Sequence, residues 1–77
     1  MMMTAMNCLV IEDQTIFLDL LASLLKSFPE IAQVAKADCV KSAEELSERQ
    51  AFDIAIIDLI LPDGDGCGLA TTLIEQH

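Results

Sequence analysis

Basic and aromatic side chains are scarce in this chain of 77 residues. The chain has four Lys and Arg residues but thirteen Asp and Glu residues, which gives a formal net charge of −9. Its aromatic residues are three Phe, without any Trp or Tyr. Nucleic acids and anionic membranes need a basic footprint on their partner, so the composition argues against direct contact with either. Metal ions and basic protein surfaces are the partners that this charge favours.

Histidine and cysteine are also sparse. The single histidine, His77, is the last residue. No set of nucleophile, base and orienting residue can therefore be assembled, and we expect no enzyme activity. The cysteines, Cys8, Cys39 and Cys67, lack the spacing of metal ligands and indicate reduced thiols. No apolar run is long enough for a signal or membrane segment, so we expect a cytoplasmic protein.

The apolar pattern predicts one α/β domain over residues 1–77, of which residues 1–6 form a disordered tail. Strands are expected at Cys8–Ile11, Ile31–Ala37 and Ile54–Asp58, and helices at Gln14–Phe28, at Ser42–Gln50 and between the turn Pro62–Gly66 and His77. Strand and helix alternate with short connections, which is typical of a parallel sheet built by right-handed crossovers.

The expected elements differ in how they bury apolar residues. The first helix carries one apolar stripe, formed by Phe17, Leu20, Leu21, Leu24, Leu25 and Phe28. The second helix has only a thin apolar face, and its start is open: Ser42-Ala43-Glu44-Glu45 fits a capping box, whereas Asp38 would cap an earlier start. The continuous apolar run of Ile54–Asp58 is typical of a strand buried on both faces.

Carboxylates follow two of the predicted strands. Glu12 and Asp13 come directly after the first strand, and Asp58 ends the third. In a sheet of order 2-1-3 these strands are neighbours about 4.8 Å apart, so the three carboxylates share one crevice. Crowded like charges favour a divalent cation, and hard oxygen ligands suit Mg²⁺ or Mn²⁺. The alternative is that Glu12 and Asp13 are first-turn helix acids and Asp58 merely begins a loop.

Three other motifs are weak. Asp63-Gly64-Asp65-Gly66 begins like an EF-hand loop, but Cys67 and Ile74 occupy ligand positions of that loop. The same glycines suggest a dinucleotide loop, yet Leu69 stands at its third glycine position. A phosphatase of the haloacid dehalogenase type would need a second Asp at position 60, which is Ile60.

The motifs around these carboxylates resemble the receiver domains of two-component response regulators, from about Cys8 to the end of the chain. Glu12-Asp13 is similar to the family's acidic pair, Asp58 to its phosphoacceptor, and Asp58-Leu59-Ile60-Leu61-Pro62-Asp63-Gly64-Asp65-Gly66 to the loop that follows the phosphoacceptor. Glu12-Asp13-Gln14, followed by Phe17 and Leu20-Leu21, is most similar to receivers of LuxR-type transcription factors.

This resemblance implies a flavodoxin-like fold and a signalling role. Asp13, Asp58 and the backbone carbonyl of Ile60 would bind Mg²⁺, and Glu12 would hold a metal-bound water. Asp58 would accept phosphate from a partner sensor histidine kinase. The resemblance therefore places the chain in phosphorelay signal transduction and transcription regulation.

The resemblance stops after the third helix. The family's hydroxyl residue after strand four and its lysine after strand five have no positions among these 77 residues. We therefore expect the N-terminal portion of a receiver, with impaired phosphoryl transfer. The alternative is a non-signalling interaction fragment that pairs with a full receiver or with itself. Residues 54–58 would then form an unprotected edge strand, and we expect self-association through it.

Overall fold

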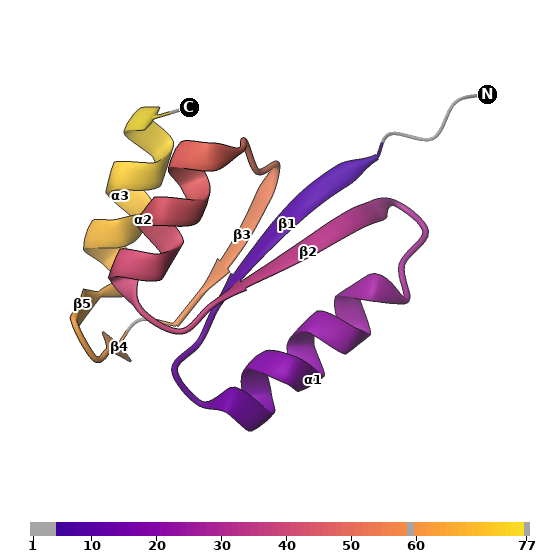
Figure 1. Cartoon of the computed structure of the whole chain (residues 1–77), viewed down its shortest axis with the longest axis horizontal. Coiled ribbons are helices and arrows are strands. Elements are labelled where there is room, and N and C mark those ends of the chain that lie inside the picture. The colour runs from indigo at the N-terminus through magenta and orange to yellow at the C-terminus, as the bar shows by residue number, and fades with distance from the viewer. Residues whose placement is uncertain (1–4, 59, 77) are drawn as a thin grey trace.

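The computed structural model describes residues 5–58 and 60–76. Three parallel strands form one sheet in the order β2-β1-β3, with bounds β1 Met6–Ile11, β2 Ile31–Ala37 and β3 Ile54–Ile57. Helix α1, Thr15–Lys26, lies on one side of the sheet, and helices α2, Val40–Arg49, and α3, Gly66–Gln76, lie on the other (Figure 1). The predicted α/β class and strand order are confirmed.

The N-terminal tail was predicted one residue too long. Met6 already belongs to β1 and pairs with Ile31 of β2, and its N–H donates to the carbonyl of Glu30 at 2.9 Å. Met6 is therefore held by the sheet. Ala5 lies outside any strand and is exposed, and residues 1–4 of the predicted tail lie outside the described residues.

Two helix starts differ from the sequence prediction. Helix α1 begins at Thr15, so Gln14 is its N-cap residue. Helix α2 begins at Val40, because Cys39 serves as its N-cap and the Cys39 Sγ accepts a hydrogen bond from the Ser42 N–H at 3.4 Å. The capping box at Ser42 is therefore wrong, because Ser42 is already the third residue of α2. The alternative of an earlier start is confirmed, although its N-cap is Cys39 and not Asp38.

A small antiparallel hairpin follows β3. Its strands are β4, Ile60–Leu61, and β5, Gly64–Asp65, and Ile60 pairs with Asp65 while Leu61 pairs with Gly64. The reversal between these strands falls inside the stretch 62–66 that was predicted as a turn. Helix α3 begins directly after β5, so the hairpin connects the end of the sheet to that helix.

The sheet separates two apolar cores. On one face Leu9 and Ile11 of β1 pack with residues of β2, α2, β4 and α3, namely Ala37, Ala43, Leu61, Leu69 and Leu73. On the other face Cys8 and Val10 pack with Leu18 of α1. The last four residues of β1 are all buried, because side chains that alternate between two faces meet a core on both. This position explains the unbroken apolar run of β1.

The apolar stripe predicted for α1 is largely on the surface. Leu18 and Ala22 are buried, whereas Phe17, Leu20 and Leu24 are 55%, 61% and 57% exposed. Among the predicted stripe residues, Leu21 and Leu25 do pack against the core of β1 and β2. The outer half of the stripe faces away from the sheet, and no second helix covers it in the described part of the chain.

Strand β3 is also more exposed than a strand buried on both faces. Ile54 and Ile56 are each 36% exposed. The cause is the position of β3 at the edge of the sheet, where its hydrogen-bonded neighbour within the described residues is β1 alone. An edge strand loses the cover that a neighbour on its second side would provide.

Candidate functional site

Two neighbouring strands bring the predicted site residues to one edge of the sheet. Ile11 of β1 pairs with Ile57 of β3, so the next residues, Glu12 and Asp58, leave the sheet together. The Asp58 N–H donates to the Ile11 carbonyl at 3.0 Å, and the Glu12 N–H donates to the Ala37 carbonyl at 3.0 Å. Backbone hydrogen bonds therefore fix both residues beside the ends of their neighbouring strands.

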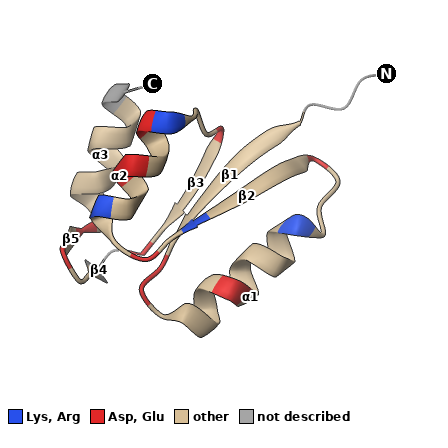
Figure 2. Ribbon diagram, in the orientation of Figure 1, with Lys and Arg blue, Asp and Glu red and all other residues tan. Residues whose placement is uncertain are grey.

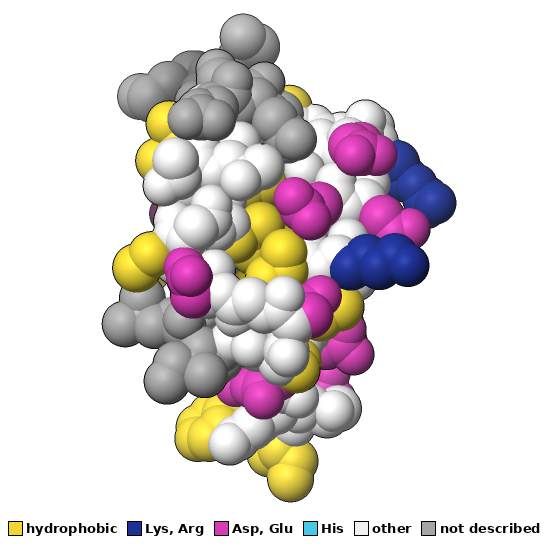
Figure 3. Space-filling model, turned by 90° about the vertical axis from the view of Figure 1, so that its left-hand side faces the viewer, with side chains coloured by type: hydrophobic (Ala, Val, Ile, Leu, Met, Phe, Trp, Pro, Cys, Tyr) yellow, Lys and Arg dark blue, Asp and Glu magenta, His cyan; other side chains and the backbone are white. Residues whose placement is uncertain are grey.

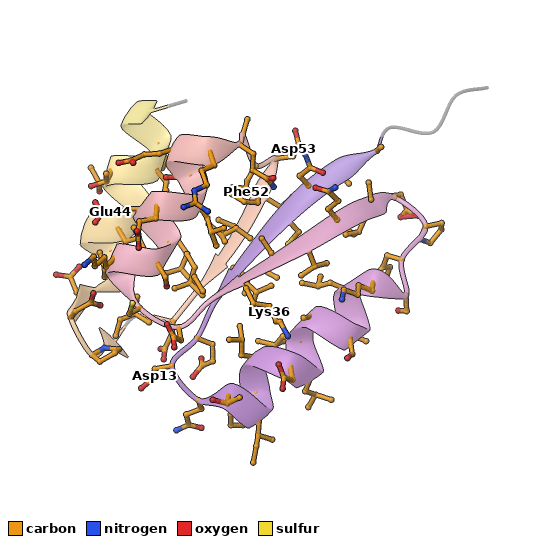
Figure 4. All side chains as sticks on the ribbon, in the orientation of Figure 1. Asp13, Lys36, Glu44, Phe52 and Asp53 are labelled. Carbon is orange, nitrogen blue, oxygen red and sulfur yellow. The ribbon has the colours of Figure 1, made fainter. Side chains whose placement is uncertain are left out.

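The three carboxylates do meet in space. One carboxylate oxygen from each of Glu12, Asp13 and Asp58 lies within 4.8 Å of the other two. Glu12 and Asp58 are half-buried and Asp13 is exposed. Figure 4 shows Asp13 at the end of the sheet where β1 leaves it, and Figure 2 shows acidic residues in the loops at that end.

Glu12 is held by the backbone that follows it. Its Oε1 accepts a hydrogen bond from the Gln14 N–H at 3.1 Å. This bond is the largest single influence on the pKa of Glu12 and lowers it, but loss of hydration and the neighbouring Asp58 and Asp13 together raise that pKa above its usual value. The crowded negative charge is thus unfavourable for the anion and favourable for a bound cation.

The donor set fits a hard divalent ion. Three carboxylates supply hard oxygen atoms, which suit Mg²⁺ or Mn²⁺. The alternative that Glu12 and Asp13 are first-turn helix acids is wrong, because α1 begins at Thr15 and its first turn contains no acidic residue. The structure places Ile60 in β4, and the role of its carbonyl stays a prediction.

Two residues near the site were missed by sequence reasoning. A Cβ atom added to Gly66 would overlap the carbonyl oxygen of Asp58 and lie 2.9 Å from the Asp58 carbonyl carbon. Asp63 accepts hydrogen bonds from the N-terminus of α2, which is more than twenty residues earlier in the chain. Gly66 could have been suspected from its place in the loop after Asp58. The sequence holds no local signal for the contacts of Asp63.

The chain thus forms a parallel α/β sheet with three carboxylates at the ends of two adjacent strands. The chain belongs to the response regulator receiver domain family, because the model of that family matches residues 8–77. The fold and the acidic pocket agree with this membership.

Three curated relatives illustrate the family. The chain is 30% identical to the transcriptional regulatory protein DpiA of Escherichia coli K12, over 97% of this chain and 34% of DpiA. It is 27% identical to the transcriptional regulatory protein CitB of Klebsiella pneumoniae, over 97% of this chain and 32% of CitB. It is 31% identical to the response regulator protein PilR of Pseudomonas aeruginosa, over 97% of this chain and 16% of PilR. The chain thus spans between 16% and 34% of the length of these relatives.

Solved structures share the fold. An aspartate-to-alanine mutant of the MaeR response regulator bound to sulfate superposes with a TM-score of 0.85 at 19% identity, over 95% of this chain and 60% of the MaeR chain. MaeR bound to beryllium trifluoride gives a TM-score of 0.83 at 20% identity, over 92% and 58%. The narrower resemblance to LuxR-type receivers stays a prediction. Among the described residues, no helix has the length and apolar character needed to cross a membrane.

Proposed function

We propose that the chain is the phosphoacceptor module of a two-component response regulator and that Asp58 accepts the phosphoryl group. The observation that carries this proposal is the meeting of three carboxylate oxygens within 4.8 Å at the ends of β1 and β3, in a chain of the receiver family. Open α/β folds bind their ligands outside the carboxyl ends of their strands, which is where these carboxylates lie.

The site residues divide the chemistry between them. Asp13, Asp58 and the backbone carbonyl of Ile60 would hold Mg²⁺ or Mn²⁺, and Glu12 would hold a water of the ion. An ion held there would supply neutralisation of the charge on the phosphoryl oxygens. A carboxylate oxygen of Asp58 forms the new bond to phosphorus while the bond between phosphorus and the donor histidine nitrogen breaks, and that nitrogen keeps the electron pair.

The partners follow from this role. In the cytoplasm, a sensor histidine kinase donates the phosphoryl group to this module. The response regulator to which the module belongs then regulates transcription. Acidic side chains spread over the face in Figure 3 while basic side chains gather at one side. We therefore assign no nucleic acid or membrane contact to this module. Its match to protein-glutamate methylesterases covers only 19% of those proteins, so we assign no enzyme activity to it either.

Incubation with a small acyl-phosphate donor and Mg²⁺, followed by mass spectrometry, tests the proposal. We expect one phosphoryl group, mapped to Asp58 and absent from Asp58→Asn. The control Asp53→Asn changes an acid at the opposite end of the sheet and should be labelled like wild type. Labelling should be slow, because the 77 residues include no counterpart of the family's hydroxyl and lysine positions.

Each other outcome of the labelling experiment is informative. Label that persists in Asp58→Asn would show that another residue is the acceptor, and an unlabelled wild type would refute the phosphoacceptor role for this chain. Stoichiometric labelling of wild type within minutes would contradict the expected impairment.

The exposed β3 supports interaction as a second candidate function. Ile54 and Ile56 are exposed along its edge, and an apolar groove of about 320 Å³ lies beside β3, lined by residues that include Phe52, Ala55 and Leu73. An unprotected apolar edge is a template for another strand. We infer that a second copy of this chain pairs with β3 in a two-fold, antiparallel arrangement.

A further inference from the structure

The carboxylate of Asp63 caps a helix to which it is not adjacent in sequence. Its Oδ1 accepts a hydrogen bond from the Val40 N–H at 2.7 Å, and its Oδ2 accepts one from the Lys41 N–H at 3.0 Å. These are the first two N–H groups of α2, which have no partner within the helix. A negative charge at this end also interacts favourably with the helix dipole.

Further contacts hold the same two segments together. A Cβ atom added to the neighbouring Gly64 would lie 2.9 Å from Val40 Cγ2, so the hairpin backbone lies directly against Val40. The hydrogen bond from the Val40 N–H, followed by that from the Lys41 N–H, lowers the pKa of Asp63 below its usual value. The contacts therefore favour the ionised carboxylate, which has two oxygens to accept them.

The two segments that Asp63 connects both lead to the acidic site. On one side, Asp63 lies between β4 and β5, and the buried Leu61 anchors this hairpin in the core after Asp58. On the other side, Val40 follows three residues after Ala37, whose carbonyl accepts the Glu12 N–H at 3.0 Å. The bonds of Asp63 thus connect the backbone that follows Asp58 to the backbone that follows Ala37, and Ala37 is bonded to Glu12.

We propose that Asp63 is a positioning residue for the acidic site: its carboxylate ties the hairpin after Asp58 to the start of α2 and so holds Asp58 and Ile60 in place relative to Glu12. The consequence for metal affinity rests on the proposed function. The consequence for the backbone around Asp58 does not, because it follows from the hydrogen bonds alone.

Asp53 offers a matched control. Its Oδ2 accepts a hydrogen bond from the Asn7 N–H at 2.8 Å, so it too is an acidic side chain that bonds a distant backbone N–H. Figure 4 shows Asp53 and Asp13 at opposite ends of the sheet. A change at Asp53 therefore removes a bond of the same kind without touching the hairpin after Asp58 or the start of α2, the two segments that Asp63 connects.

The first experiment compares amide signals and hydrogen exchange of the 77-residue chain by NMR, without metal, in wild type, Asp63→Asn and Asp53→Asn. Because an amide has one acceptor oxygen where the carboxylate has two, Asp63→Asn keeps the size of the side chain but makes the Val40 and Lys41 N–H groups share one oxygen or lose a bond. We expect exchange at Val40 or Lys41 to be faster by about tenfold and the signals of Glu12 and Asp58 to shift. Asp53→Asn should leave all four signals unchanged.

The second experiment measures Mn²⁺ affinity of the same proteins by calorimetry. We expect Asp63→Asn to bind about tenfold more weakly than wild type, as is usual when a group that orients a metal ligand is changed, and Asp53→Asn to bind within about twofold of wild type. Loss of stability alone would weaken both variants, so the difference between them reports positioning.

Two results would overturn the proposal. The backbone role fails if the Glu12 and Asp58 signals are as unaffected by Asp63→Asn as by Asp53→Asn. The role in the site fails if Asp63→Asn binds Mn²⁺ as tightly as wild type does. Wild type that binds no Mn²⁺ refutes the metal part of the proposed function instead, and the NMR comparison still decides whether Asp63 positions the backbone.

Discussion

Replacing Gly66 by alanine adds a single methyl group, and the structure predicts a large loss of folding stability from it. A Cβ at this position would overlap the Asp58 carbonyl oxygen and lie 2.9 Å from Ile57 Cγ2. Ordinary carbon contacts need roughly 3.5 Å or more, and a main-chain carbonyl cannot rotate away as a side chain does. The backbone of Asp58 and the start of α3 must therefore move apart.

Overpacking of this kind costs about 1–3 kcal/mol in well-packed proteins, and we expect the upper end of that range because the two nearest atoms belong to the Asp58 backbone. Alanine is favoured over glycine in a helix by about 1 kcal/mol, which is too little to offset the clash. Gly66 has no positive φ, so backbone strain adds nothing to this figure. For a domain of this size a loss of about 2 kcal/mol lowers Tm by roughly 8–16 °C.

Thermal and urea unfolding followed by circular dichroism measure this effect, with Gly68→Ala as the control. A Cβ on Gly68 would meet only the Asp65 carboxylate, 3.2 Å away at the far end of a flexible side chain, so Gly68→Ala should stay within about 1 kcal/mol of wild type. A Gly66→Ala variant as stable as Gly68→Ala would refute the close packing of Gly66 against Asp58. An unfolded Gly66→Ala beside a folded Gly68→Ala would support it.

Four further predictions follow from the site, the core and the edge. Asp58→Ala should bind Mn²⁺ about tenfold or more weakly than wild type in calorimetry, and equal binding would exclude Asp58 as a ligand. Leu18→Ala should lower the free energy of unfolding in urea by about 2–4 kcal/mol, because Leu18 is 7% exposed. Leu20→Ala should change it by less than about 0.5 kcal/mol, because Leu20 on the same helix is 61% exposed. Equal losses would contradict the packing of the Leu18 side of α1 against the sheet. The pKa of Asp63 is lowered in the folded chain, so the stability that its carboxylate contributes is present above the usual pKa of 3.8 and is lost as pH falls through the lower pKa of the folded state. The difference in stability between wild type and Asp63→Asn should therefore shrink below pH 3.8. A difference that stays constant with pH would show that ionisation of Asp63 is unimportant. Antiparallel pairing centred on β3 would set Asp53 of one chain opposite Asp58 of its copy, and these like charges repel each other. Because salt or Mg²⁺ weakens this repulsion, we expect either to strengthen association in size-exclusion chromatography with light scattering at two concentrations. An 8.4 kDa monomer under all of these conditions would rule out this dimer.

The sequence determined the order and type of the main elements because each has a strong local signature. The unbroken apolar run before Glu12 and the alternation of strand and helix predicted β1 and the parallel sheet. Strand β2 was predicted with the bounds that the structure shows, Ile31–Ala37. The meeting of Glu12, Asp13 and Asp58 could also be predicted, because adjacent parallel strands deliver their C-terminal residues to one edge.

Tertiary structure alone decided which apolar side chains are buried. A pattern of 3.6 residues shows that α1 has an apolar side, but Phe17, Leu20 and Leu18 are equally apolar in sequence, and only contact with β1 and β2 selects Leu18 for the core. The apolar run of β3 likewise predicted a strand buried on both faces, and its exposed edge could be predicted only from the strand order 2-1-3. Its exposure depends on whether a neighbour lies at its second side, which no local pattern encodes.

The N-cap of α2 and the contacts of Asp63 were beyond local reasoning for a related physical reason. Hydrogen bonds and close approaches between residues far apart in the chain depend on where the fold places their backbones. Val40 and Asp63 are 23 residues apart in sequence yet bonded at 2.7 Å. The sequence therefore determined which carboxylates gather at the edge of the sheet, and the tertiary structure decided what holds them there.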